Sequence, residues 1–127
     1  MSKSQKNKIV LVVEDDSILR PLLVELLTEM QFNIMVAEDG DSAYALMKEL
    51  QGKKESIDLL LTDIGLPGMN GRDLAALARA MWPSLSILFI TGYAYGVGEL
   101  PVDNNIKLIT KPFSLGTFTE RVEELIA

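Results

Sequence analysis

Short, continuously apolar runs alternate with longer amphipathic segments along this chain of 127 residues. The first run is IVLVV, and the residues after it are apolar at spacings of three and four. A strand that is apolar at every position suits a parallel sheet covered on both faces, and its alternation with helices indicates an α/β fold. The apolar runs predict strands over residues 9–13, 32–37, 57–62, 85–90 and 106–110.

Helical periodicity follows the first, second, third and fifth of these runs. The first helix carries a wide apolar stripe, which we expect to lie in the core: Ile18, Leu19, Leu22, Leu23, Leu26, Leu27 and Met30. The last helix carries its apolar residues on one face: Leu115, Phe118, Val122 and Leu125. Side chains that can cap helix starts precede each segment. They are Asp16 or Ser17, Asp41 or Ser42, Asn70, and Ser114.

The segment TGYAYGVGELP, between the fourth and fifth runs, lacks clean periodicity and contains three glycines. Interior glycines disfavour a helix by about 1 kcal/mol each relative to alanine. We therefore expect a short or irregular fourth helix. We also expect residues 93–103 to be loosely ordered until the protein is activated.

The composition excludes several classes of function. The chain has no cysteine and no histidine, which removes disulfides, the usual zinc sites and Ser–His–Asp catalysis. A net charge of −6 argues against general nucleic-acid binding. No apolar run approaches the roughly 18 residues of a membrane span, and no signal region follows the basic start. We expect a soluble cytoplasmic protein, with residues 1–7 a flexible lead and residues 8–127 one domain.

Charged and polar side chains stand where the predicted strands end. Glu14 and Asp15 follow the first strand, and Asp63 follows the third. Thr91 follows the fourth, and Lys111 follows the fifth. The carboxyl ends of parallel strands meet at one edge of the sheet, where such folds place their sites. We therefore expect these side chains to lie together.

This set of residue types suits phosphoryl chemistry. Clustered carboxylates repel one another, and a hard divalent cation with oxygen ligands, such as Mg²⁺, relieves that repulsion. A carboxylate beside a metal and an ammonium group can act as a nucleophile toward a phosphoryl group. The cation and Lys111 would then neutralise charge on the transferred oxygens.

Four motifs in order carry a resemblance to a known family: VVEDD, TDIGLPGMNG, ITG and TKPF. With this spacing the chain resembles the receiver domain of two-component response regulators, and the residues of its motifs are similar to those in receivers of hybrid histidine kinases. The resemblance implies a flavodoxin-like five-stranded parallel sheet in the order 2-1-3-4-5, with helices on both faces.

The resemblance also implies roles for single residues. Asp63 would be the phospho-acceptor, and Mg²⁺ would be held by Glu14, Asp15, Asp63 and the carbonyl of Gly65. Thr91 and Lys111 would contact the phosphoryl group, and the Lys111–Pro112 peptide would be cis. Leu108 stands where many members have an aromatic residue that turns inward on activation, so we do not expect that aromatic switch here.

The implied function is a phosphorylation-dependent signalling switch. A histidine kinase or a histidine phosphotransfer protein would donate the phosphoryl group, and a downstream protein would receive the signal by contact or by onward transfer. The protein would support its own Mg²⁺-dependent phosphorylation and dephosphorylation without being an enzyme in the usual sense. We expect a monomer or weak dimer with no nucleic-acid or membrane partner, and favour a single-domain regulator slightly over a piece of a hybrid kinase.

Two other classes of function were weighed. A degenerate receiver would serve only as a protein-binding module, which the intact acidic residues, Thr91 and Lys111 disfavour. A phosphatase of the aspartyl-phosphate class would need a second aspartate where Gly65 stands, and a flavin protein would need a Ser/Thr-rich loop after the first strand.

Overall fold

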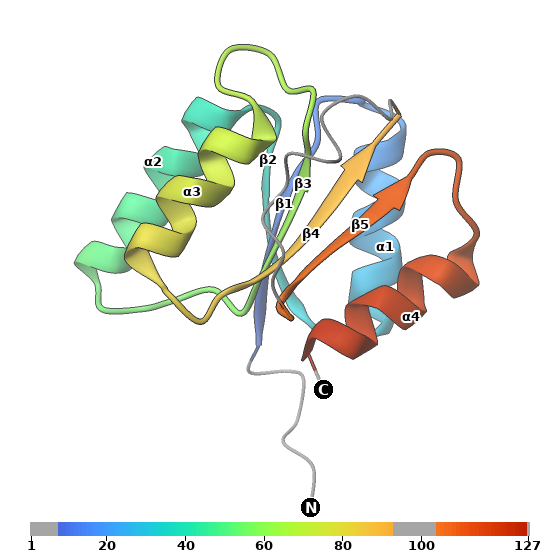
Figure 1. The fold of residues 1–127 in the computed structure, drawn as a ribbon. Helices are drawn as coiled ribbons and strands as arrows, with labels where there is room; N and C mark the ends of the chain where they lie inside the picture. Colours follow the sequence, from blue (N-terminus) through green and yellow to red (C-terminus); the bar gives the residue numbers. More distant parts are fainter. Residues whose placement is uncertain (1–7, 93–103, 127) are drawn as a thin grey trace, which may run out of the picture.

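The computed structural model describes residues 8–92 and 104–126. Its strands are β1 (Ile9–Val13), β2 (Asn33–Ala37), β3 (Leu59–Asp63), β4 (Ser86–Thr91) and β5 (Ile106–Thr110). The helices of the described part are α1 (Leu19–Glu29), α2 (Gly40–Gly52), α3 (Gly71–Met81) and α4 (Leu115–Ile126). All strand pairs are parallel and the order is β2-β1-β3-β4-β5, as predicted (Figure 1).

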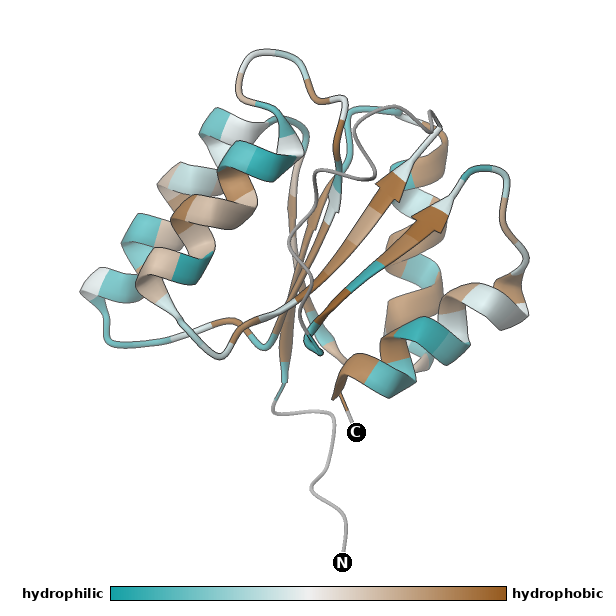
Figure 2. Ribbon diagram, viewed as in Figure 1, coloured by the Kyte–Doolittle hydropathy of each residue, from teal (hydrophilic) through white to brown (hydrophobic). Residues whose placement is uncertain are grey.

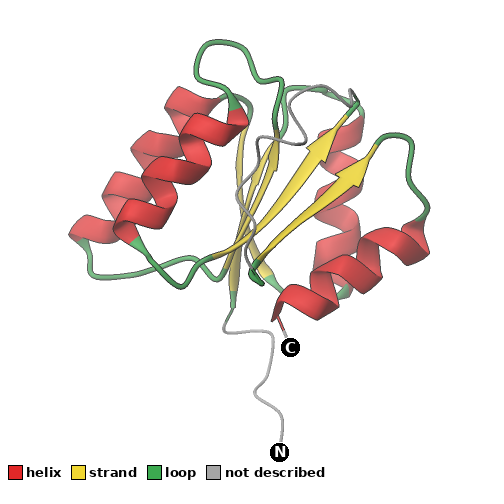
Figure 3. Ribbon diagram, in the orientation of Figure 1, coloured by secondary structure: helices red, strands yellow, loops and turns green. Residues whose placement is uncertain are grey.

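The sheet is covered on both faces. Helices α2 and α3 lie on one face, and α1 and α4 lie on the other (Figure 3). The central strands are mostly apolar, with polar residues at their ends, which explains how they tolerate burial on two sides (Figure 2). Successive side chains of β1 enter different clusters: Leu11 and Val13 pack toward α2 and α3, whereas Val10 and Val12 pack toward α1 and α4.

The predicted element ends need small corrections. Strands β2 and β4 each start one residue later than expected, β3 starts two residues later, and β3 and β4 each extend one residue further. The cap of α2 is Asp39, whose Oδ1 accepts a hydrogen bond from the amide of Ser42, and neither predicted residue caps that helix. Asn70 and Ser114 cap their helices as predicted.

The prediction that the whole stripe of α1 lies in the core is wrong. Leu23 and Leu27 are buried, but the side chains of Ile18 and Leu22 are 76% and 51% exposed. Leu115, predicted for the inward face of the last helix, is 63% exposed. A helix on a sheet buries only one stripe of its circumference, and the apolar stripe of α1 is wider than its contact with the sheet.

The segment predicted to hold an irregular helix, residues 93–103, lies outside the described residues, as does the lead of residues 1–7. Within the described part, no helix has both the length and the apolar character needed to cross a membrane.

Candidate functional site

Alternation along the strands directs three charged side chains to the same face of the sheet. Glu14 lies two residues after Val12, Asp63 two after Leu61, and Lys111 two after Ile109, and those three apolar residues belong to the cluster beneath α1 and α4. Side chains two residues apart in a strand point to the same side. The site therefore assembles at the carboxyl edge, as expected.

Backbone hydrogen bonds hold the chain in place just beyond the strand ends. The amide of Glu14 donates to the carbonyl of Ala37 (3.2 Å), and that of Lys111 donates to the carbonyl of Thr91 (2.7 Å). The sheet's register thus continues into the residues that carry the charges, and their positions are set by the sheet.

Lys111 joins the two buried carboxylates. Its Nζ lies 2.6 Å from Oδ2 of Asp63 and 3.1 Å from Oε1 of Glu14. Burial lowers the pKa of the Lys111 ammonium, but its hydrogen bond to Asp63 and its close contact with the Glu14 carboxylate outweigh burial, so the pKa is raised above its ordinary value. Lys111 is therefore a fixed positive charge beside Asp63.

Glu14 is almost fully buried, with 1% of its surface exposed. Its Oε2 accepts a hydrogen bond from the amide of Asp16 (3.1 Å). Burial raises the pKa of the Glu14 carboxyl and is the largest effect. The hydrogen bond from the Asp16 amide lowers this pKa, the negative charge of Asp63 raises it, and Lys111 lowers it. The net result is a pKa above the ordinary value for glutamate. A buried carboxylate with a raised pKa is one that a further cation would stabilise.

The acidic residues fit a metal such as Mg²⁺. Carboxylate oxygens of Glu14, Asp15 and Asp63 lie within 4.8 Å of one another. Oε1 of Glu14 is buried and makes no hydrogen bond within the described part of the chain, although Lys111 forms an ion pair with it. Asp15 is exposed, so the cluster is open to solvent on one side. Hard oxygen ligands with room for water are what Mg²⁺ requires.

Asp63 is held at both carboxylate oxygens. Lys111 contacts Oδ2, and the amide of Gly65 donates to Oδ1 at 2.9 Å. Gly65 thus lies next to the carboxylate, while the metal-binding role expected for its carbonyl stays a prediction. Thr91 is buried at the end of β4, one residue beyond Ile90, the pairing partner of Asp63. Its contact with a phosphoryl group also stays a prediction. The Lys111–Pro112 peptide is cis, as the resemblance implied.

The response regulator receiver domain family matches residues 10–123 of this chain. The chain belongs to this family. It is 35% identical over 121 residues to the response regulator receiver protein CpdR of Brucella abortus, covering 94% of this chain and 97% of CpdR.

Solved structures agree with the sequence match. The receiver domain of the hybrid histidine kinase CckA superposes with a TM-score of 0.77 at 29% identity, covering 94% of this chain and 99% of that one. The response regulator TrrA of Thermotoga maritima, solved with Mg²⁺-BeF, gives a TM-score of 0.77 at 29% identity over 93% of this chain and 98% of that one. This receiver is a phosphorylation-dependent switch of two-component signalling.

The loop after β3 is fixed by close contacts at two glycines, which sequence reasoning missed. The amide of Gly71 donates to the carbonyl of Ile64 (2.9 Å), and a Cβ on Gly71 would lie 2.1 Å from the carbonyl oxygen of Asp63. A Cβ on Gly40, at the start of α2, would lie 2.7 Å from the carbonyl oxygen of Met69. The sequence shows a glycine at the end of the motif LPGMNG and another at the start of α2, but it does not show which atoms they contact.

The loop after β1 is also held from within the receiver. Oδ1 of Asp16 accepts from the amides of Ile18 (2.8 Å) and Leu19 (3.0 Å) and so supports the start of α1, but the N-cap residue is Ile18, without a side-chain cap hydrogen bond, and neither predicted residue occupies the cap. The guanidinium of Arg20 donates to the main-chain carbonyl of Glu14 at 2.8 Å. Sequence reasoning did not single out Arg20, because an arginine on a helix usually reads as a solvent-exposed charge.

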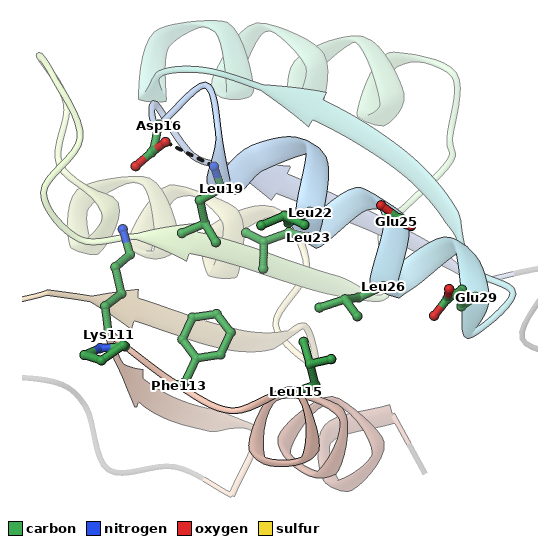
Figure 4. A pocket seen from close by; sticks show the side chains of 11 residues that line it. Asp16, Leu19, Leu22, Leu23, Glu25, Leu26, Glu29, Lys111, Phe113 and Leu115 are labelled. Carbon is green, nitrogen blue, oxygen red and sulfur yellow. Dashed lines mark hydrogen bonds between the residues drawn. The ribbon is translucent and has the colours of Figure 1, made fainter.

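An open groove of about 550 Å³ runs from the site along α1 (Figure 4). Leucines of α1, Leu22 among them, line one wall, and Phe113 and Leu115 line the other. Lys111 lies at one end of the groove, and Glu29 lies at the far end (Figure 4). The apolar wall explains why part of the α1 stripe is exposed.

Proposed function

We propose that Asp63 accepts a phosphoryl group from a phosphohistidine, and that Glu14, Asp15, Asp63 and the carbonyl of Gly65 hold Mg²⁺. The observation that carries the proposal is the Asp63 carboxylate, held by Lys111 and the Gly65 amide beside two further carboxylates. The chain has no histidine, so the donor belongs to a partner, a histidine kinase or a histidine phosphotransfer protein.

The transfer is a displacement at phosphorus. An oxygen of Asp63 forms the new bond to phosphorus, the bond from phosphorus to the histidine nitrogen breaks, and the electron pair leaves with the imidazole, which retains or takes up a proton. Bound Mg²⁺ would supply charge neutralisation at the phosphoryl oxygens. Lys111 exchanges its contact with Asp63 for one with a phosphoryl oxygen, and Thr91 donates a hydrogen bond to another.

Hydrolysis restores the resting state. A water oxygen forms a bond to phosphorus, the bond from phosphorus to the Asp63 oxygen breaks, and the electron pair returns to the carboxylate, which regains its contact with Lys111. The proton of the attacking water leaves with inorganic phosphate or passes to solvent. On this proposal the receiver supports both its own phosphorylation and its own dephosphorylation. The signal leaves by protein contact or by transfer to another histidine.

Mass spectrometry tests the acceptor directly. After incubation with acetyl phosphate and Mg²⁺, the parent chain should gain the mass of one phosphoryl group, and Asp63→Asn should gain none. Asp15→Ala should lose most Mg²⁺ affinity, because the metal loses a charged ligand. Equal labelling of the parent and Asp63→Asn would place the acceptor elsewhere, and no labelling of the parent would favour the binding-module alternative.

The groove along α1 suits the partner that carries the histidine. Because a phosphohistidine must come within bonding distance of Asp63, the partner has to cover the surface beside Lys111. Leu22 and Leu115, which are exposed and line the groove, offer apolar contact there, and an amphipathic helix of the partner would fill the groove. The acidic far end, at Glu25 and Glu29, complements a basic residue on that helix.

The cytoplasmic location and the monomer or weak dimer expected from the sequence stay predictions. Analytical ultracentrifugation with and without beryllofluoride would measure the oligomeric state before and after activation.

A further inference from the structure

We propose that Arg20 is a positioning residue for the metal site, acting through the main chain of Glu14. The inference rests on the proposed Mg²⁺ role of Glu14 and Asp15. Arg20 lies in the first turn of α1, and its Nη1 donates to the carbonyl oxygen of Glu14 at 2.8 Å. The same residue begins the helical ladder, because its amide donates to the carbonyl of Asp16 (3.0 Å).

The side chain and the main chain of Glu14 are held by separate contacts. The Asp16 amide donates to Oε2 of the Glu14 side chain, while Arg20 donates to the Glu14 carbonyl. The carbonyl of Glu14 belongs to the same planar peptide as the amide of Asp15. Holding that carbonyl therefore sets the direction in which the chain enters Asp15, the exposed member of the carboxylate cluster.

Support from this helix adds to the hydrogen bonds that Asp16 makes in the loop after β1. Glu14 is tied to β2 through its amide, but Asp15 follows beyond the last strand residue. A ligand placed within a few tenths of an ångström needs partners outside the ligand set. Arg20 supplies such a partner from a rigid helix.

The other contact of Arg20 does not account for its placement. Its Nη2 lies 3.9 Å from Oε2 of Glu38, whose side chain is 71% exposed. Exposed pairs at this distance contribute little to stability. The side chain of Arg20 is only 22% exposed, so most of its surface is covered by the rest of the protein.

The charge and the hydrogen bond of Arg20 have opposite effects on a bound cation. A positive charge near Mg²⁺ repels it, so removal of the charge alone would strengthen Mg²⁺ binding. Loss of the hydrogen bond to Glu14 would loosen the ligands and weaken Mg²⁺ binding. The direction of the change in affinity therefore separates positioning from a purely electrostatic or structural role.

Isothermal titration with Mg²⁺ on Arg20→Met, Arg20→Lys and Glu38→Gln makes the test. We expect Arg20→Met to bind Mg²⁺ about tenfold more weakly, as for other partners outside the ligand set. Arg20→Lys, which keeps a donor of similar reach, should recover most of the affinity. Glu38→Gln, which removes only the exposed pair, should bind like the parent. Equal or tighter binding by a folded Arg20→Met would overturn the inference.

A measurement on the parent chain keeps the inference testable if Arg20→Met does not fold. The guanidinium protons of Arg20 should give separate NMR signals with and without Mg²⁺, because a hydrogen bond to Glu14 restricts rotation. A single averaged signal in both states would overturn it. Unchanged Mg²⁺ affinity in Asp15→Ala would instead overturn the proposed metal site, so the two failures are distinguishable.

Discussion

The two helical layers cover the same sheet but present different surfaces. Helices α2 and α3 pack against each other, and neither contributes a large exposed hydrophobic side chain among the described residues (Figure 1). Helix α1 exposes Leu22 and the start of α4 exposes Leu115 along the groove. We call the layer of α2 and α3 the closed layer, because its hydrophobic side chains are covered, and the layer of α1 and α4 the open layer, because it borders the groove.

The two layers have different roles around the Asp63 carboxylate: one supports its position, and the other offers a surface for a partner. The closed layer meets Asp63 through the close contact at Gly71, and it meets the loop that follows Asp63 through the close contact at Gly40. The open layer begins at Lys111, on the other side of that carboxylate. One side therefore holds the acceptor still, while the other leaves room for a partner to approach it.

Gly71→Ala should have the largest effect on stability, because the added Cβ clashes at the tightest contact of the closed layer. The added Cβ would lie 2.1 Å from the carbonyl oxygen of Asp63, and backbone cannot move aside as a side chain can. We expect a loss of about 4 kcal/mol in the free energy of unfolding, in the range of severe core lesions. Urea unfolding followed by circular dichroism measures it.

Gly52→Ala is the matched control at the end of α2. A Cβ there meets nothing within 4 Å, so the change should be neutral or stabilise by up to about 1 kcal/mol through helix propensity. Equal losses in both variants would show that helix propensity, and not the close contact, explains the glycine at position 71.

Neighbouring leucines of α1 test the open layer. Leu23 is 1% exposed and Leu22 is 51% exposed. Leu23→Ala should cost about 3 kcal/mol of unfolding free energy through lost burial and a cavity. Leu22→Ala should stay within about 0.5 kcal/mol, as for surface positions. A large loss in Leu22→Ala would mean that the groove wall is part of the core.

Leu22→Glu should separate docking from chemistry. A charge in the apolar groove wall must be desolvated when a partner helix covers it. We expect phosphotransfer from a phosphorylated histidine phosphotransfer domain to slow about tenfold, equivalent to about 1.4 kcal/mol. Labelling by acetyl phosphate, a donor too small to need the groove, should proceed at the parent rate. Equal slowing with both donors would remove the groove from partner recognition.

The smallest expected effect concerns the pH dependence of the closed layer. The Ser42 amide, and then the Ser42 hydroxyl, lower the pKa of the Asp39 carboxyl below its ordinary value of 3.8. The charged cap therefore stabilises the fold fully above that pH, and this stabilisation is lost as the pH falls below 3.8. Asp39→Asn keeps a capping oxygen but does not titrate.

The difference in unfolding free energy between the parent and Asp39→Asn should thus shrink as the pH falls from 5 toward 2.5, measured by urea unfolding. A constant difference across that range would show that the charge of Asp39 contributes nothing to the cap.

The strands themselves and the residues of the acidic edge could be predicted because each depends on local pattern, whereas the order of the strands came from the resemblance to receivers. A run such as IVLVV has to be buried on both faces, and residues at parallel strand ends meet at one edge whatever the loops do. The hydrogen bond from Lys111 to Asp63 follows from that geometry and from the resemblance to receivers.

Contacts that depend on how loops pack could not be predicted. Nothing in the sequence tells that Asp39 caps α2 instead of Asp41, because both are acceptable cap residues one turn from an amphipathic pattern. The exposure of Leu22 depends on how α1 sits on the sheet, which periodicity alone does not specify. The contact of Arg20 with a main-chain carbonyl could not be predicted, because every residue type has the same carbonyl.

The bond between Lys111 and Asp63 joins residues 48 positions apart, and β5 is the strand that brings them together. Contacts at such separation form late, after the cost of closing long loops has been met. A nascent or partly unfolded chain would hold the nucleophile without its lysine. On the proposed function, competence to receive a signal therefore coincides with completed folding, so that immature or damaged copies stay silent in the pathway.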